Sequence, residues 1–200
     1  IAIFIPTSLG TITISLKCVL IFFLREDIHP EPRRMILYAF TVGALVSFPV
    51  LATQIIFQAL TSPIQNIIIL IIGLALIEEV FKFLAAYWAI NDKPEFDEPI
   101  DAMIYIIAAA LGFATVENIF IVGNSLNLIN NSILNSTINT LSLRFVGATL
   151  LHTLSSGLVG FYWARAKIKK NLTLNITIGL TLATLTHSLF NYLILRFQNT

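Results

Sequence analysis

The chain has 200 residues, of which 56% are hydrophobic and only 12% charged, with a formal net charge of +1 and a mean hydropathy of +0.85. Soluble domains carry about twice that share of charged residues, so the composition excludes an ordinary soluble protein and indicates an integral membrane protein. The small net charge gives no support for nucleic-acid binding. We expect one all-α, membrane-embedded domain covering residues 1–200.

Six segments are apolar and long enough, at about 20 residues, to cross a bilayer as helices. They are residues 1–24, 36–60, 64–90, 100–123, 141–165 and 172–197. The breaks between them are short or rich in Pro, Asn, Ser and Thr, and residues 123–140 are expected to form an Asn-rich loop. The pattern therefore predicts a polytopic transmembrane helical bundle with about six spans.

Lysine and arginine are distributed unevenly over the connections between these segments. Residues 25–34, 91–99 and 166–171 carry several, whereas residues 61–63 and 124–140 carry none. Cytoplasmic loops of membrane proteins carry an excess of Lys and Arg. We therefore expect a multi-pass protein of the cell membrane in which the connections 25–34, 91–99 and 166–171 are cytoplasmic.

Polar side chains interrupt the middle of four predicted spans, although each charge there costs roughly 2.5–3.5 kcal/mol. They are Glu78, Glu79 and Lys82 (EEVFK) in the third span, Glu117 and Asn118 in the fourth, His152 and Ser156 in the fifth, and His187 and Asn191 in the sixth. At 1.5 Å rise per residue, the acids and histidines lie within roughly one and a half helical turns of one depth. Residues four apart share a helix face, so the pattern predicts one internal site.

Carboxylates and imidazoles in one cavity can activate water for hydrolysis. A glutamate accepts the proton of the water, while a histidine orients the water or protonates the leaving amine. Amides, hydroxyls and a second histidine can stabilise the oxyanion. Lys82 can fix one glutamate and leave the other as the base, and the sequence leaves open which of Glu78 and Glu79 is which. The predicted catalytic residues are Glu78, Glu79, His187, His152 and Glu117, supported by Lys82, Asn118, Ser156 and Asn191.

The same residue types suit a zinc ion, which in catalytic sites typically has three protein ligands and a water. No predicted helix carries the HExxH pattern, so the sequence leaves metal binding open. If an ion is bound, its ligands would be His152, His187 and either Glu78 or Glu79. Intramembrane acids and histidines also mark ion paths, so a proton- or cation-coupled transporter or channel is the main alternative. A catalytically inactive adaptor is a third possibility.

Several linked motifs resemble those of one family. They are EPRRM at 31–35, EEVFK at 78–82, FDEPIDAMIY at 96–105 leading into LGFATVEN at 111–118, and GLVGFYWARA at 157–166. From about residue 20 to 195 the chain resembles the PrsW family of membrane-embedded proteases, which belongs with the wider group containing the CAAX-prenyl endopeptidases. The resemblance implies an endopeptidase that cuts a single-pass, membrane-anchored regulatory protein such as an anti-sigma factor. It also implies that Glu78, Glu79 and His187 matter most for activity, with Glu117 and His152 in the same site.

Overall fold

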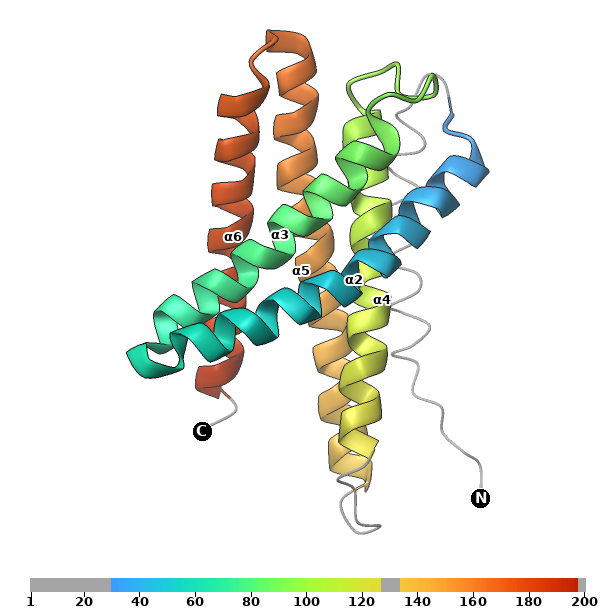
Figure 1. Ribbon diagram of the computed structural model, residues 1–200. Coiled ribbons are helices and arrows are strands. Elements are labelled where there is room, and N and C mark those ends of the chain that lie inside the picture. The colour runs from blue at the N-terminus through green and yellow to red at the C-terminus, as the bar shows by residue number, and fades with distance from the viewer. Residues whose placement is uncertain (1–29, 127–133, 198–200) are drawn as a thin grey trace, which may run out of the picture.

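The computed structural model of the chain describes the backbone of residues 30–126 and 134–197, and the side chains of residues 30–121 and 146–196. Every regular element in these ranges is a helix (Figure 1). The elements are α2 (Arg33–Thr61), the short 3-10 helix η1 (Ser62–Ile64), α3 (Ile67–Ile90), α4 (Asp101–Leu126), α5 (Leu134–Lys169) and α6 (Leu172–Phe197). The predicted all-α class is confirmed for this part of the chain.

Three stretches are long and apolar enough to cross a bilayer, namely Arg33–Ile64, Asp101–Ile121 and Leu172–Arg196. Helix α3 has sufficient length, with 24 residues, but carries two glutamates and a lysine at its centre. The length and apolar composition of these helices indicate a membrane protein. The count of six spans stays a prediction, and the first predicted span, 1–24, lies outside the described residues.

One boundary prediction is wrong. Helix α4 continues to Leu126 and helix α5 already begins at Leu134, so residues 123–126 and 134–140 are helical rather than part of the predicted loop 123–140. The Asn, Ser and Thr residues of this stretch favoured a loop, but each lowers helix stability by less than about 1 kcal/mol relative to alanine. That preference is too weak to end a helix that continues into a long apolar segment.

The five α-helices contact one another in a closed ring. Going round the ring, α2 packs on α4, α4 on α5, α5 on α6, α6 on α3, and α3 on α2. Figure 1 shows α2 and α3 as an antiparallel pair, joined through η1, that crosses α4, α5 and α6 obliquely. Helix α3 also contacts α4 and α5. Its central residues therefore face the interior of the ring.

The described parts of the connections rich in Lys and Arg, residues 30–34, 91–99 and 166–171, lie at the same end of the bundle (Figure 1). Arg34 at the start of α2 forms an ion pair with Glu95 at 3.0 Å. Lys167 near the end of α5 donates to the backbone carbonyl of Phe96 at 2.9 Å. The predicted grouping of these connections on one side is therefore consistent with the fold. That this side is cytoplasmic stays a prediction.

Helices α2 and α4 approach backbone to backbone at two glycines. A Cβ atom at Gly43 would lie 1.9 Å from the carbonyl oxygen of Ala109, and one at Gly112 would lie 1.9 Å from the carbonyl oxygen of Phe40. Small residues allow such close packing between membrane helices. The contact fixes the position of α2 on α4, and with it the position of the α2 side chains that face α3.

We expect Gly43→Ala to destabilise the protein by about 1–3 kcal/mol or more, because the added methyl meets backbone that cannot move aside. Thermal unfolding in detergent measures the effect. Gly157→Ala is the matched control, since a Cβ there would lie 3.8 Å from Ile107, an ordinary contact. Equal melting temperatures for the two variants would contradict the close α2–α4 packing.

Candidate active site

Six of the predicted residues form one connected network inside the ring. Glu78, Glu79 and Lys82 come from α3, Glu117 from α4, His152 from α5 and His187 from α6. All are buried except Glu117, whose side chain is 35% exposed. The helical spacing on α3 turns its three charged residues towards the other helices of the ring, so groups far apart in the sequence meet at one depth.

Glu79 is held through one oxygen, Oε1, while its Oε2 is buried without a hydrogen-bond partner among the described residues. Its Oε1 accepts hydrogen bonds from Lys82 Nζ at 2.7 Å and Ser155 Oγ at 3.0 Å. His187 Nδ1 lies 2.8 Å from the same oxygen. An ionised carboxylate only accepts hydrogen bonds, so Nδ1 of His187 carries the proton. Glu79 thus fixes both the tautomer and the orientation of His187.

His152 uses both ring nitrogens within the network. Its Nδ1 lies 3.2 Å from Lys82 Nζ, and an ammonium group donates but does not accept. Nδ1 is therefore the acceptor, and the proton of the neutral ring lies on Nε2. That nitrogen donates to Glu117 Oε2 at 2.6 Å. His152 links the lysine of α3 to the carboxylate of α4.

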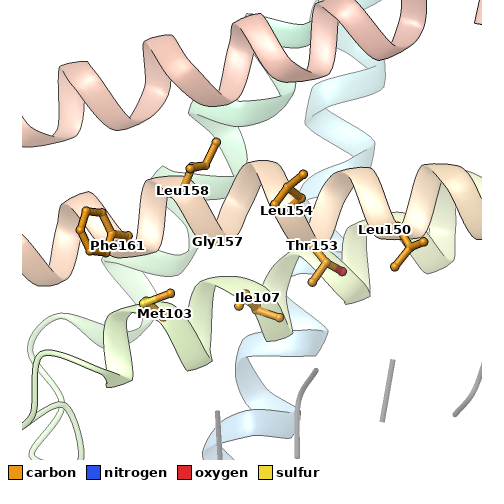
Figure 2. A pocket seen from close by; sticks show the side chains of 8 residues that line it. All are labelled: Met103, Ile107, Leu150, Thr153, Leu154, Gly157, Leu158 and Phe161. Atoms are coloured by element: carbon orange, nitrogen blue, oxygen red, sulfur yellow. The ribbon is translucent and has the colours of Figure 1, made fainter. Parts of the chain in front are cut away.

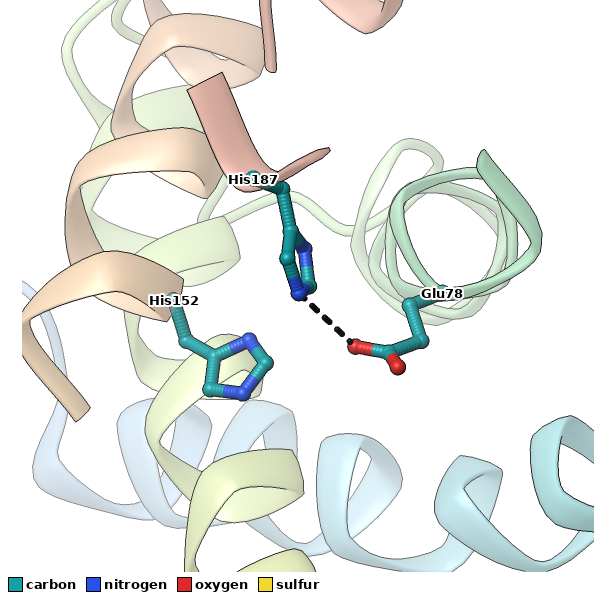
Figure 3. A group of neighbouring side chains, drawn as sticks. All are labelled: Glu78, His152 and His187. Atoms are coloured by element: carbon teal, nitrogen blue, oxygen red, sulfur yellow. Dashed lines mark ion pairs between the residues drawn. The ribbon is translucent and has the colours of Figure 1, made fainter. Parts of the chain in front are cut away.

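Glu78 and His187 face each other across a gap. Glu78 Oε1 accepts from Gln54 Nε2 at 2.8 Å, whereas Oε2 is buried and has no hydrogen-bond partner. This oxygen lies 3.6 Å from His187 Nε2 (Figure 3), which is too long for a hydrogen bond. Because Nδ1 carries the proton of His187, Nε2 presents a lone pair. Two atoms that both accept hydrogen bonds therefore face the same space.

The gap and the charges around it fit a metal ion. Ligand atoms of Glu78, His152 and His187 all lie within 4.8 Å of one another. Two tetrahedral zinc ligands with bonds of about 2.0–2.2 Å lie about 3.4 Å apart, close to the 3.6 Å between Glu78 Oε2 and His187 Nε2. With neutral imidazoles, three carboxylates and one ammonium also leave an excess of two negative charges. His152 could join as a ligand only by giving up one of its present partners.

Two of the cavities among the described helices are lined by residues of α4. One, of about 240 Å³, lies between α2, α3 and α4 and borders the network at Gln54, Glu78 and Glu117. The other, of about 450 Å³, lies between α4 and α5 and is lined by apolar residues such as Ile107 and Leu154, with Thr153 among them (Figure 2). None of the six network residues lines this larger cavity.

Three predicted supporting residues lie outside the network. Asn118 is buried and donates to Thr149 Oγ1 at 3.2 Å, which ties α4 to α5. Ser156 is buried, but its hydroxyl has no partner among the described residues. Asn191 lies one turn beyond His187 on α6 and is half-buried. No described hydrogen bond joins it to the network.

Two residues of the network were not predicted. Ser155, rather than Ser156, donates to Glu79. The two serines follow His152 by three and four residues, and both intervals place a residue on nearly the same helix face as His152. Gln54 holds Glu78 from α2. Its amide within the apolar run of residues 50–57 was the available signal, because a polar side chain in a span usually has a partner.

Comparisons with known proteins indicate one family. Residues 31–200 match the family model described as PrsW family intramembrane metalloprotease. The chain is 33% identical over 149 residues to Protease PrsW of Geobacillus kaustophilus, covering 73% of this chain and 60% of that protein. It is 30% identical to Protease PrsW of Oceanobacillus iheyensis, covering 87% of this chain and 76% of that protein. It is 25% identical to Protease PrsW of Bacillus subtilis, covering 89% of this chain and 78% of that protein. No solved structure matches the chain.

Proposed function

The chain belongs to the PrsW family of intramembrane metalloproteases, and from that premise we propose that it hydrolyses a peptide bond of a membrane-anchored protein at the gap between Glu78 and His187. The gap carries the proposal because Glu78 Oε2, which has no hydrogen-bond partner among the described residues, lies there 3.6 Å from His187 Nε2. The substrate class that the family resemblance implies is a single-pass regulatory protein of the anti-sigma-factor kind. The proposed location is the cell membrane.

In this mechanism Glu78 accepts the proton of the attacking water at Oε2. Gln54 fixes the other oxygen of Glu78, so the accepting oxygen points into the gap. His187 Nε2 orients the water, receives this proton from Glu78 Oε2 across the gap to form the imidazolium, and then gives it to the leaving amine as the C–N bond breaks. Glu79, bonded to Nδ1, stabilises the imidazolium that forms, as the aspartate does in a serine-protease triad.

The remaining network residues support this pair. Lys82 balances the charge of Glu79 and fixes His152 through Nδ1. His152 in turn orients Glu117, whose partly exposed carboxylate lies at the cavity beside Glu78. Glu117 is the group of the network best placed to contact a substrate that enters from this cavity.

The donor set also fits the metal ion that the family description implies. Glu78 and His187 would hold it, with His152 as the third ligand. A bound ion would supply Lewis-acid polarisation of the scissile carbonyl and a more acidic water. In that case Glu78 is a ligand, and Glu117 is the carboxylate left to accept the proton.

The proposal is tested with purified protein in liposomes that contain a library of single-span peptides randomised around the outer end of the span. We expect cleavage, with the cut positions read by mass spectrometry. Proton or cation flux without any cleavage would instead favour a transporter. Partner binding without cleavage would favour an adaptor.

The metal content of the protein distinguishes the two proposed roles of Glu78, as general base and as metal ligand. If an ion is held as proposed, His187→Gln is expected to lower the bound zinc, measured by elemental analysis, by about 10–100-fold or more, because a ligand is lost. Gln58→Leu is the control, because Gln58 lies on α2 and lines a different cavity. Equal metal content in His187→Gln and the unchanged protein would contradict metal binding at this gap.

A further inference from the structure

We propose that the cavity of about 240 Å³ between α2 and α4 is the subsite that receives one bulky apolar side chain of the substrate next to the scissile bond. This inference rests on the proposed protease function. It adds a determinant of sequence preference, which the six charged and imidazole groups by themselves do not provide.

The cavity borders the proposed base. Glu78 forms part of its wall, and the same carboxylate faces His187 across the gap. A side chain seated here therefore belongs to a residue whose backbone lies within reach of Glu78. Phe113 extends this wall and packs against the ring of His152, with centroids 5.4 Å apart.

The lining favours hydrocarbon over charge. Most of the wall is apolar and is formed by Val50, Leu51, Phe113, Phe120 and Ile121. One oxygen of each carboxylate in the wall already has a partner, since Glu78 Oε1 accepts from Gln54 and Glu117 Oε2 accepts from His152. Burial of an apolar side chain in such a pocket is favourable by about 25 cal/mol per Å² of apolar surface.

The cavity has about 240 Å³, which gives room for one large side chain. The mouth lies at Leu51 and Phe120, which are 43% and 41% exposed. A side chain can therefore enter sideways between α2 and α4.

The peptide library in liposomes tests the subsite with two variants that change its size in opposite directions. For the unchanged protein we expect Leu, Ile, Met or Phe to be enriched at one position beside the cut. Leu51→Trp narrows the mouth and is expected to shift the preference towards Gly, Ala and Ser by about 10-fold or more. Phe120→Ala widens it and is expected to shift the preference towards the largest side chains, which keeps the test decisive if Leu51→Trp is inactive.

Leu45→Trp is the matched control, because Leu45 lies on the same helix, is 60% exposed and does not line the cavity. We expect it to leave the preference unchanged. Cleavage with no side-chain preference, with a preference for Lys or Arg, or with a preference that neither cavity variant alters would overturn the subsite. No cleavage of any library member by the unchanged protein would instead overturn the proposed protease function.

Discussion

Glu78→Gln is expected to lower kcat for peptide cleavage by about 10²–10⁴-fold, the usual contribution of a general base, while leaving the melting temperature nearly unchanged. The amide has almost the same size as the carboxylate, and its oxygen can still accept from Gln54. It cannot accept a proton from water. The buried site already has an excess of negative charge, so the loss of this charge does not remove a needed partner.

Glu79→Gln is the matched comparison and separates the roles of the two adjacent acids. It weakens hydrogen bonds that Oε1 accepts from Lys82, Ser155 and His187. We therefore expect it to lower both kcat and the melting temperature. Glu95→Gln, at the end of the bundle, controls for the loss of a carboxylate outside the site. We expect it to change kcat and the melting temperature only slightly. Wild-type kcat in Glu78→Gln would refute its role, with or without an ion.

The sequence contained enough information to bring the site together but not to assign its parts. Polar residues at a shared depth on four apolar segments predicted the cluster of Glu78, Glu117, His152 and His187, because burial in a membrane forces such groups to face one another. The choice between Glu78 and Glu79 could not follow from spacing. Lys82 lies four residues after one and three after the other, and both spacings allow contact on a helix.

Tertiary contacts support the proposed choice of Glu78 as the base and Glu79 as the residue held by Lys82. His187 Nδ1 and Ser155 both reach Glu79 from helices more than 70 residues away in sequence. Gln54 reaches Glu78 from α2, because Gly43 and Gly112 allow that helix to pack closely on α4. None of these pairings has a local pattern. The fold class followed from composition, whereas helix α5 extended beyond its predicted start because weak polar propensities do not end a helix.

The buried pair of Lys82 and Glu79 is expected to be the most sensitive point for stability. Their side chains are fully buried and joined at 2.7 Å. Lys82→Met leaves the charge of Glu79 buried without its ammonium partner, so we expect a loss of about 3–5 kcal/mol. Chemical or thermal unfolding in detergent measures this loss. Arg34→Met breaks an exposed pair with Glu95, in which the arginine side chain is 80% exposed, and should cost at most about 1 kcal/mol.

The double variant Glu79→Gln with Lys82→Met distinguishes charge balance from geometry. Removing both charges eliminates the uncompensated carboxylate, so most of the stability lost in Lys82→Met should return. The amide oxygen at position 79 can still accept from His187 Nδ1, but it cannot stabilise an imidazolium by its charge. We therefore expect kcat to remain low while the melting temperature recovers. A double variant as unstable as Lys82→Met would show that Lys82 stabilises the fold mainly through His152, and recovery of both quantities would remove Glu79 from the proposed mechanism.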